Sequence, residues 1–466
     1  MPSTIIQIVA TLTGTLLTLS DGMQSAWTSP IVIKLTSPSS PIKIQDSDVS
    51  LLENIYMIGA LFGLTISIFV LDIIGRKNTM LMVGVSNIII WFVIGFATSV
   101  IVLTIARFFA GVANNVNFIA STAYIGEISE KTIRGRLGSL LRGMLTFGML
   151  IIYSVGPYVS IFASSMVGVG IIVLHLLTFP FMPESPYFLL MKNRKDQARK
   201  SLKMLRRLDD VEEELEYIEE TIERERYERR RPLDLIKIKT NRRALLILIV
   251  LNFAQQFSGN TIIYMNIHEI LLNASFDISP NIAAIAYSAL MLASCLLFTS
   301  LVDKIGRRFF LCASCLLTTI SLFLLAAYFV AQNRINVEGF LWIPVFAIML
   351  YGGSFTMGLL IVPTILTSEL FPTNIKSIAV SVCSGTFLIS GSLSLLLYHG
   401  LKTYGMYVPF FVFAFCTLAA GVFSYFFVFE TKNKTLAEIQ AILEHEVYGK
   451  KEGYGTLNEN ENYESD

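Results

Sequence analysis

The chain has 466 residues, of which 53% are hydrophobic and only 15% are charged, and its formal net charge is +1. Soluble domains carry roughly 25% charged residues, so this composition excludes an ordinary soluble protein. The near-neutral charge and the absence of a basic tail argue against a nucleic-acid partner. The five cysteines lie in apolar stretches, and Cys312 and Cys315 have no second Cys or His pair nearby, so we expect no metal site.

Twelve apolar segments predict membrane-spanning helices, because about 20 apolar residues cross a bilayer as a helix. In chain order they are 5–27, 51–71, 80–98, 100–122, 137–160, 162–182, 243–267, 281–302, 309–331, 340–366, 377–400 and 405–429. The first segment follows no basic region and continues past Asp21, which favours a first span over a cleaved signal peptide. We therefore expect an all-α membrane protein of two six-helix bundles, over residues 1–185 and 241–430.

Residues 186–240 predict a cytoplasmic helical linker between the bundles. Six apolar residues recur there at helical spacing, which predicts amphipathic helices: Leu202, Leu205, Leu208, Leu215, Ile218 and Ile222. A dense charge block follows them, and it is either a solvated surface or a contact to lipid headgroups. Residues 431–466 form a polar tail that we expect to be largely disordered.

Lysine and arginine residues collect in alternate connections between the spans, and cations favour the cytoplasmic side. Both termini and the linker are therefore predicted to be cytoplasmic. The sequon at Asn273 then lies outside, where a glycan can be attached, whereas the sequon at Asn433 lies inside and should remain unmodified.

Three features recur in the same order about half a chain apart. Asp72…Gly75-Arg76-Lys77 matches Asp303…Gly306-Arg307-Arg308, and the pair Glu127 and Arg134 matches Glu369 and Lys376. Glu184 in Pro-Glu-Ser-Pro likewise matches Glu430 in Phe-Glu-Thr-Lys. Repeats of this kind indicate a duplicated half, as in many transporters.

The charged residues of these motifs all lie where spans end on one side of the membrane. The candidate gating network comprises Asp72, Arg76, Glu127, Arg134, Glu184, Asp303, Arg307, Glu369 and Glu430. Charge-assisted pairs between helices and between halves would hold that side closed and would break to open it. The alternative is that these residues only anchor the topology. The positive-inside rule requires only bases, so the paired acids favour gating.

These motifs, with Gln255-Gln256-Phe-Ser-Gly259 and Glu369-Leu-Phe-Pro-Thr373, resemble the sugar porter family of the major facilitator superfamily. Ala26-Trp-Thr-Ser-Pro30 is most similar to the insect facilitated trehalose transporter-like group. The resemblance implies a plasma-membrane carrier that moves trehalose or a hexose by alternating access. The partners it implies are the sugar substrate and the lipid bilayer. It implies no enzymatic activity, no cofactor and no obligate protein partner.

The resemblance also implies a substrate site, because the family's glutamine pair contacts the sugar. Side-chain amides both donate and accept hydrogen bonds, which suits sugar hydroxyls, although an interhelical hydrogen bond is the alternative. Candidate ligands are Gln255, Gln256, Asn260, Thr261, Arg142 and Thr364. Several positions depart from the family: Thr261 stands at the usual Asn, Met291 at another common Asn, and Thr364 at the span-10 Trp.

Arg142 and Gln24 bear on the alternatives. Arg142 stands where the family has a sugar-contacting Gln, and it either reaches back to the membrane surface or lines the cavity. In the cavity it would need Asp21 or an acidic substrate as partner, so a carrier of another polyol or an organic anion is an alternative. Gln24 occupies the place of the Asp of proton-coupled members, which favours uniport, while Asp21 keeps symport open. A sugar receptor that does not transport is the alternative of a different class.

Overall fold

The computed structural model describes residues 2–37, 40, 42–130, 132–227, 233–274, 279–434 and 436–448. These residues form helices and no strand. Within them, twelve helical segments are long and apolar enough to cross a membrane, which confirms the predicted number of spans.

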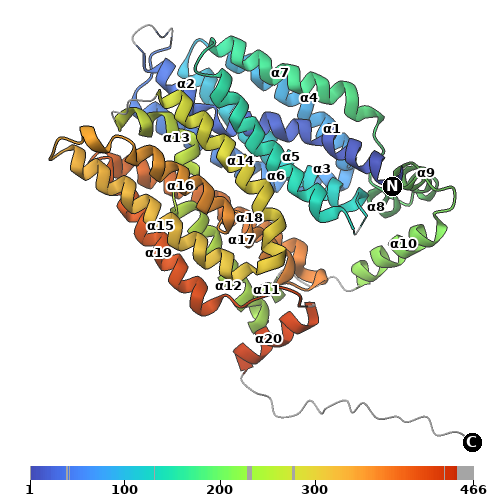
Figure 1. Cartoon of the computed structure of the whole chain (residues 1–466). Helices are drawn as coiled ribbons and strands as arrows, with labels where there is room; N and C mark the ends of the chain where they lie inside the picture. The colour runs from blue at the N-terminus through green and yellow to red at the C-terminus, as the bar shows by residue number, and fades with distance from the viewer. Residues whose placement is uncertain are drawn as a thin grey trace, which may run out of the picture.

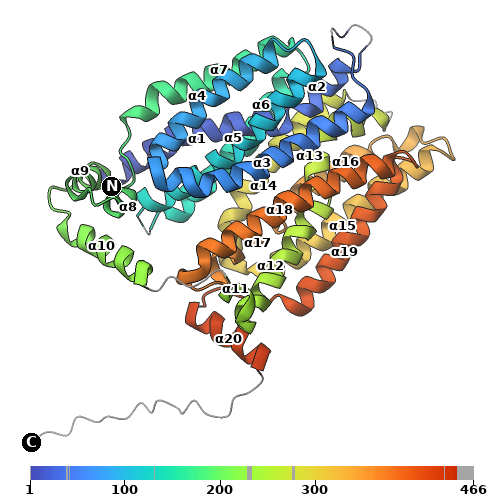
Figure 2. The same ribbon diagram turned by 180° about the vertical axis from the view of Figure 1, so that it is seen from behind.

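The first six spans form the N-terminal half and the last six form the C-terminal half. The N-terminal half comprises α1 (Pro2–Ala26), α3 (Asp46–Ile74), α4 (Arg76–Gly95), α5 (Val100–Ile128), α6 (Arg134–Val155) and α7 (Ile161–Thr178). The C-terminal half comprises α12 (Lys239–Phe257) with α13 (Asn260–Asn273), α14 (Pro280–Ile305), α15 (Arg307–Gln332), α16 (Ile343–Met357) with α17 (Val362–Glu369), α18 (Thr373–Lys402) and α19 (Tyr407–Phe427). The halves lie side by side and pack along α3 with α18 and α6 with α14 (Figures 1 and 2).

The two ends of the bundle differ. One end, here called the linker face, carries α8 (Pro186–Met191), α9 (Lys195–Arg206), α10 (Glu212–Tyr227), α11 (Asp234–Lys237) and α20 (Leu436–Tyr448), with the N-terminus beside α9 (Figure 1). The opposite end, here called the outer face, carries α2 (Thr28–Leu35) and α13.

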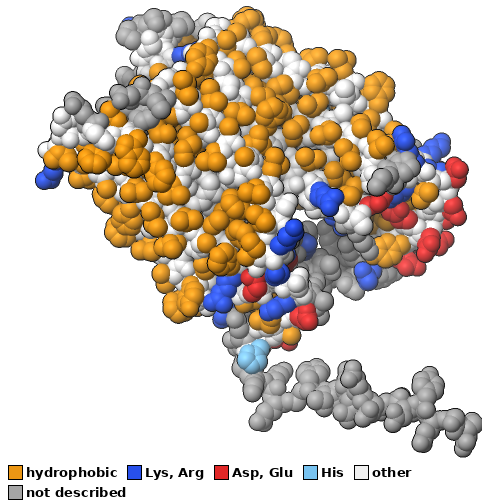
Figure 3. All heavy atoms as spheres, viewed as in Figure 1, with side chains coloured by type: hydrophobic (Ala, Val, Ile, Leu, Met, Phe, Trp, Pro, Cys, Tyr) orange, Lys and Arg blue, Asp and Glu red, His pale blue; other side chains and the backbone are white. Residues whose placement is uncertain are grey.

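The sides of the bundle are apolar. Large side chains such as Phe69, Phe96 and Phe181 are more than 60% exposed. Figure 3 shows hydrophobic side chains covering most of the visible surface, while charged ones gather at the linker face. Exposed apolar surface of this extent suits hydrocarbon and would not remain monomeric in water.

Four spans end later than the sequence predicted at the linker face, namely the second, fourth, eighth and tenth. The second and fourth predicted spans ended at residues 71 and 122, whereas α3 continues to Ile74 and α5 to Ile128. Asp72 and Glu127 therefore lie inside helices instead of after them. Hydropathy marks where the apolar run ends, but a helix continues beyond it when its charged residues have partners.

The linker helices pack against the N-terminal half. Leu202, Leu205 and Leu215 are fully buried, which confirms the amphipathic prediction for them. The prediction was wrong for Leu208, which is 59% exposed because α9 ends at Arg206 and the chain turns there. Arg206 holds the linker to the bundle by donating to the carbonyl of Ile128 at 2.9 Å.

Candidate functional site

The repeated motif of the N-terminal half forms a compact polar cluster at the linker face. Arg76 Nη2 lies 2.9 Å from Glu127 Oε1, and the hydroxyl of Ser185 donates to the other oxygen of Glu127. The carboxylate of Glu184 accepts the backbone N–H of Lys77 at 3.0 Å. The sequence analysis did not identify Ser185, whose partner is far away in the chain. Asp72 lies 3.7 Å from Arg76 and is largely exposed.

The C-terminal half repeats these contacts. Arg307 Nη2 lies 3.1 Å from Glu369 Oε1, and Thr431 Oγ1 donates to Glu369 Oε2 at 2.6 Å. Glu430 accepts the backbone N–H groups of Arg307 at 3.0 Å and Arg308 at 3.1 Å. The two clusters match contact for contact, which supports the internal repeat. The side chain of Asp303, also predicted to take part, lies outside the described residues.

In both halves a glutamate caps a helix N-terminus through a glycine turn. Gly75 (φ +93°) precedes α4 and Gly306 (φ +133°) precedes α15. A Cβ at these positions would lie 2.5 Å from Glu184 Oε2 and 2.6 Å from Glu430 Oε2, so only glycine admits the carboxylate. Burial acts to raise the pKa of Glu430, but its backbone donors outweigh burial and hold that pKa below its usual value.

Ion pairs between the two halves were predicted at the linker face, but the described residues of these clusters form none in this conformation. Each ion pair just described lies within one half, and Glu127 pairs with Arg76, not with Arg134. Arg134 donates to the carbonyl of Ser129 at 3.4 Å and experiences the like charge of Lys376 from the other half. The seven-residue spacing marks Glu127 and Arg134 as a repeated motif, but the two do not pair, because Arg134 begins the next helix after a turn.

Arg134 also lines a pocket of about 1050 Å³ at the linker face. The pocket lies between the end of α5, the start of α6 and the linker helices, and Glu127, Arg206 and Tyr217 line it as well. The linker-face clusters therefore join helices within each half, and the N-terminal cluster borders open space in this conformation.

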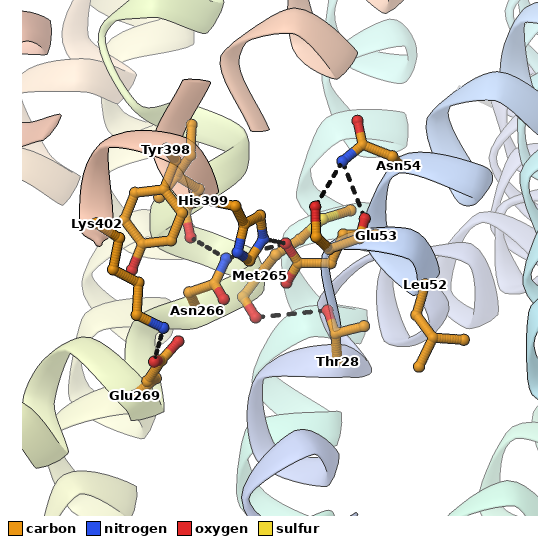
Figure 4. A network of polar contacts seen from close by, with 12 residues as sticks. Thr28, Leu52, Glu53, Asn54, Met265, Asn266, Glu269, Tyr398, His399 and Lys402 are labelled. Atoms are coloured by element: carbon orange, nitrogen blue, oxygen red, sulfur yellow. Dashed lines mark hydrogen bonds and ion pairs between the residues drawn. The ribbon is translucent and has the colours of Figure 1, made fainter. Parts of the chain in front are cut away.

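At the outer face, by contrast, hydrogen bonds join the two halves. Thr28 Oγ1 donates to the carbonyl of Met265 at 3.4 Å, and Ser29 Oγ lies 2.8 Å from His268 Nδ1. Further bonds link Ser392 to Asn54 at 2.9 Å and the hydroxyl of Tyr153 to the carbonyl of Tyr264. Figure 4 shows part of this network. The outer face is closed, and sequence reasoning did not identify the residues that close it.

Between the faces, two spans break within the bundle, and a third break follows α1 where it reaches the outer face. The chain departs from helix at Trp27 between α1 and α2, at residues 258–259 between α12 and α13, and at residues 358–361 between α16 and α17. Broken helices leave backbone carbonyls without partners, and transporters place binding sites at such breaks.

The predicted glutamine pair lies at the α12–α13 break. Gln255 Nε2 donates to the carbonyls of Leu359 and Leu360 in the α16–α17 break, at 2.5 and 3.3 Å. Gln256 Oε1 accepts from Thr261 Oγ1 at 2.6 Å, while its Nε2 is buried and has no hydrogen-bond partner among the described residues. In this conformation Gln255 makes an interhelical bond, and Gln256 keeps a free donor.

The remaining candidates occupy different surroundings. Asn260 and Thr261 are buried in the first turn of α13, beside Gln256. Thr364 is exposed on α17. The guanidinium of Arg142 lies 5.2 Å from the ring of Phe118 and close to Cys295 of the other half.

Asp21 does not pair with Arg142, contrary to one of the predicted possibilities. Its carboxylate is fully buried and accepts from Asn117 Nδ2 at 2.5 Å and from Asn87 Nδ2 at 3.2 Å. These two amides come from α5 and α4, so Asp21 is enclosed within the N-terminal half.

Two buried tyrosines adjoin the glutamine pair. The hydroxyl of Tyr287 (α14) has no hydrogen-bond partner among the described residues, whereas the hydroxyl of Tyr351 (α16) lies beside the side chain of Ser258 in the α12–α13 break. The two side chains interact electrostatically, Tyr287 also with Tyr264, and the hydroxyl of Tyr264 donates to Thr261 at 3.4 Å. Sequence reasoning did not identify Tyr287 or Tyr351, because aromatic residues in an apolar helix usually indicate core packing.

Comparison with known proteins identifies the family. The family model described as "Sugar (and other) transporter" matches residues 6–443. The chain belongs to this family. Members with similar sequences include facilitated trehalose transporters Tret1 of Apis mellifera ligustica, 27% identical over 93% of this chain and 87% of the relative, and of Polypedilum vanderplanki, 29% identical with the same coverage.

Solved structures show the same fold for this sugar transporter family member. The xylose transporter XylE from E. coli in an inward open conformation has a TM-score of 0.75 at 20% identity, covering 94% of this chain and 99% of XylE. A structure of the proton:xylose symporter XylE bound to 6-bromo-6-deoxy-D-glucose gives 0.73 at 20% identity, with the same coverage. The chain therefore has the major facilitator fold, as the resemblance implied.

Arg107 is fully buried in the N-terminal half, and its Nη1 donates to the backbone carbonyl of Gln24 at 2.6 Å. The predicted glycosylation site at Asn273 is accessible. Asn273 is exposed at the end of α13, and its Nδ2 donates to the carbonyl of Glu269 at 2.9 Å. Ser275, the third residue of that sequon, lies outside the described residues.

Proposed function

We propose that this chain is a facilitative carrier that moves a sugar, trehalose or a hexose, across the plasma membrane by alternating access. The observation that carries the proposal is the asymmetry of the two faces: hydrogen bonds join the halves at the outer face, whereas the charged clusters at the linker face each stay within one half. A carrier in one of its two end states has this arrangement. The relatives named facilitated trehalose transporters support sugar as the substrate class.

In this proposal the linker face and both termini are cytoplasmic, which the concentration of Lys and Arg there favours, and the described conformation is then closed to the outside. In this scheme residues 1–185 and 241–430 rock against each other, while 186–240 spans between them and 431–466 forms the tail. The charged clusters keep each half rigid during rocking, and a glycan at Asn273 would lie outside.

The proposed sugar site surrounds the break between α12 and α13. Gln256 Nε2 and the hydroxyl of Tyr287 are buried donors without a hydrogen-bond partner among the described residues, and a buried donor left unsatisfied costs roughly 1–3 kcal/mol. The hydroxyl of Tyr351 lies beside Ser258 at the same break. Sugar hydroxyls accept from such donors. Asn260 and Thr261 adjoin them, whereas Gln255 would contribute its carbonyl oxygen, since its amide N–H groups already bind backbone.

Counterflow in proteoliposomes tests the proposal. Vesicles preloaded with unlabelled trehalose or glucose should transiently accumulate the labelled sugar, and a pH gradient should leave that accumulation unchanged. Binding without counterflow, in vesicles that contain folded protein, would favour a receptor instead. Accumulation driven by the pH gradient would favour symport, and Asp21 would then be the first carboxyl to substitute.

Arg142 defines a second test within the same assay. Its guanidinium has an aromatic ring as its near neighbour, so an acidic substrate remains chemically compatible with this position. If Arg142→Gln gains sugar counterflow that the parent protein lacks, the parent carries a different polyol or an organic anion.

A further inference from the structure

A single carboxylate of the N-terminal half holds two helices of the C-terminal half at the outer face. Glu53 on α3 has a fully buried side chain, and its Oε2 lies 2.9 Å from Nε2 of His399 on α18. The same oxygen accepts from Nδ2 of Asn266 on α13 at 3.3 Å. Figure 4 shows the His399 and Asn266 side chains pointing toward Glu53. Opening the outer face must therefore break both contacts.

The other oxygen of the Glu53 carboxylate makes no hydrogen bond to the described residues. Glu53 Oε1 is buried without a hydrogen-bond partner among the described residues, and so is Nη2 of Arg107 on α5. Arg107 Nε donates to the carbonyl of Leu52 at 3.5 Å, and the guanidinium lies 4.3 Å from the ring centre of Tyr56. Glu53 and Arg107 interact electrostatically without forming an ion pair in this conformation. An unused acceptor and an unused cationic donor thus lie in the same half.

The other charged and titratable side chains near Glu53 do not compete with Arg107 and His399 for its carboxylate. Lys402 on α18 and Glu269 on α13 form an ion pair with each other, and both belong to the C-terminal half. Tyr264 and Tyr398, which also interact electrostatically with Glu53, carry no charge as phenols. Arg107 and His399 are therefore the two basic side chains available as alternative partners of Glu53 among the described residues.

We propose that Glu53 is a switch between two partners. With the outer face closed it holds His399 and Asn266, and when α13 and α18 withdraw it binds Nη2 of Arg107. This inference rests on the proposed alternating access. Removing the partner of a buried carboxylate is strongly unfavourable, so a clamp without a second partner would lock the carrier. Arg107 offsets that loss and keeps the two states close in free energy, as a carrier requires.

The switch predicts opposite effects for its two partners. His399→Ala removes the closed-state contact and should raise the outward-open population about ten-fold, the factor that corresponds to one hydrogen bond to a charged group. Arg107→Met removes the open-state donor and should lower that population by a similar factor. The conservative variants His399→Gln and Arg107→Lys, which each keep a donor, should lie between these values and the parent.

Cysteine labelling measures this population without requiring any sugar. Thr28 is fully buried where the halves meet, so in a Thr28→Cys reporter the thiol reacts with a membrane-impermeant methanethiosulfonate only when the outer face opens. Labelling is measured on intact cells and on inside-out vesicles, relative to protein without the reporter. Glu269→Gln is the matched control, because it breaks an ion pair at the same face that lies within one half.

The expected result is faster labelling from outside in His399→Ala, slower labelling in Arg107→Met and no change in Glu269→Gln. Shifts in the same direction, or no shift in either partner variant, would overturn the switch. Surface biotinylation identifies variants that fail to fold, and the conservative pair then supplies the comparison. Counterflow on the same proteins separates the two proposals: opposite shifts without counterflow refute the carrier function alone, and counterflow without opposite shifts refutes the switch alone.

Discussion

The glycine before α15 gives the sharpest test of the repeated helix caps. Gly306 has φ +133° and ψ 149°, a backbone conformation that essentially only glycine adopts, and an alanine there costs about 1–3 kcal/mol in strain. The added methyl would lie 2.6 Å from Glu430 Oε2, so the carboxylate must move away from the backbone N–H groups it caps. Hydrogen bonds to a charged group contribute about 1.5–3 kcal/mol. Gly306→Ala should therefore destabilise the protein by roughly 2.5–6 kcal/mol.

Thermal unfolding of the purified protein in detergent measures this effect. Gly306→Ala should lower Tm by several degrees, and Gly75→Ala should do the same at the matching turn of the N-terminal half. Gly170→Ala is the control, since a methyl group there meets nothing within 4 Å and lies inside helix α7. The reasoning would be refuted if Gly306→Ala had the same Tm as Gly170→Ala and the parent protein.

Three further predictions follow from the same contacts. Since backbone donors lower the pKa of Glu430, its stabilisation is complete above the ordinary carboxyl pKa of about 4.3 and is lost as pH falls through the lowered value. The Tm difference between the parent and Glu430→Gln should thus stay constant from about pH 8 to 5 and vanish in stronger acid; a difference that grows in acid would contradict the sign. Tyr287→Phe and Tyr351→Phe should each raise the sugar KM about ten-fold, as expected for one lost hydrogen bond, whereas Tyr328→Phe, whose hydroxyl binds Ala274 at the outer end of α13, should not. Glu127→Gln and Glu369→Gln should slow counterflow to a similar extent while leaving membrane insertion intact, because each carboxylate joins an arginine to a hydroxyl within its own half; normal rates in both would show that these clusters have no part in transport.

Much of the fold could be predicted because the bilayer fixes it. The length of an apolar run determines a span, so the number of spans follows from hydropathy alone, and the recurrence of Gly75-Arg76 as Gly306-Arg307 reveals the duplicated halves. Helix ends such as Ile128 were less predictable, because a charged residue with a partner can extend a helix beyond its apolar run.

The contacts of the site were harder to predict, because they join residues far apart in the chain. Glu53 and His399 are separated by 346 positions, and no sequence motif links the two. The spacing of Glu127 and Arg134 revealed a repeated motif but not the partners of Glu127, which are Arg76 and Ser185 in the folded chain. For Gln255 the sequence left two roles open, and its place opposite the broken α16–α17 segment explains why it bonds to backbone carbonyls here.

The central claim is that the halves must separate at the outer face for sugar to cross. Asn54 and Ser392 lie on α3 and α18 with their side chains 2.9 Å apart, so an Asn54→Cys, Ser392→Cys pair can be joined by oxidation or by a short thiol cross-linker. The Asn54→Cys and Ser392→Cys single variants are the controls. They are needed because the native cysteines of the described spans are free and could also react with the oxidant or cross-linker. We predict that cross-linking abolishes counterflow of trehalose or glucose and that reductant restores it. Undiminished counterflow in fully cross-linked protein would contradict the account.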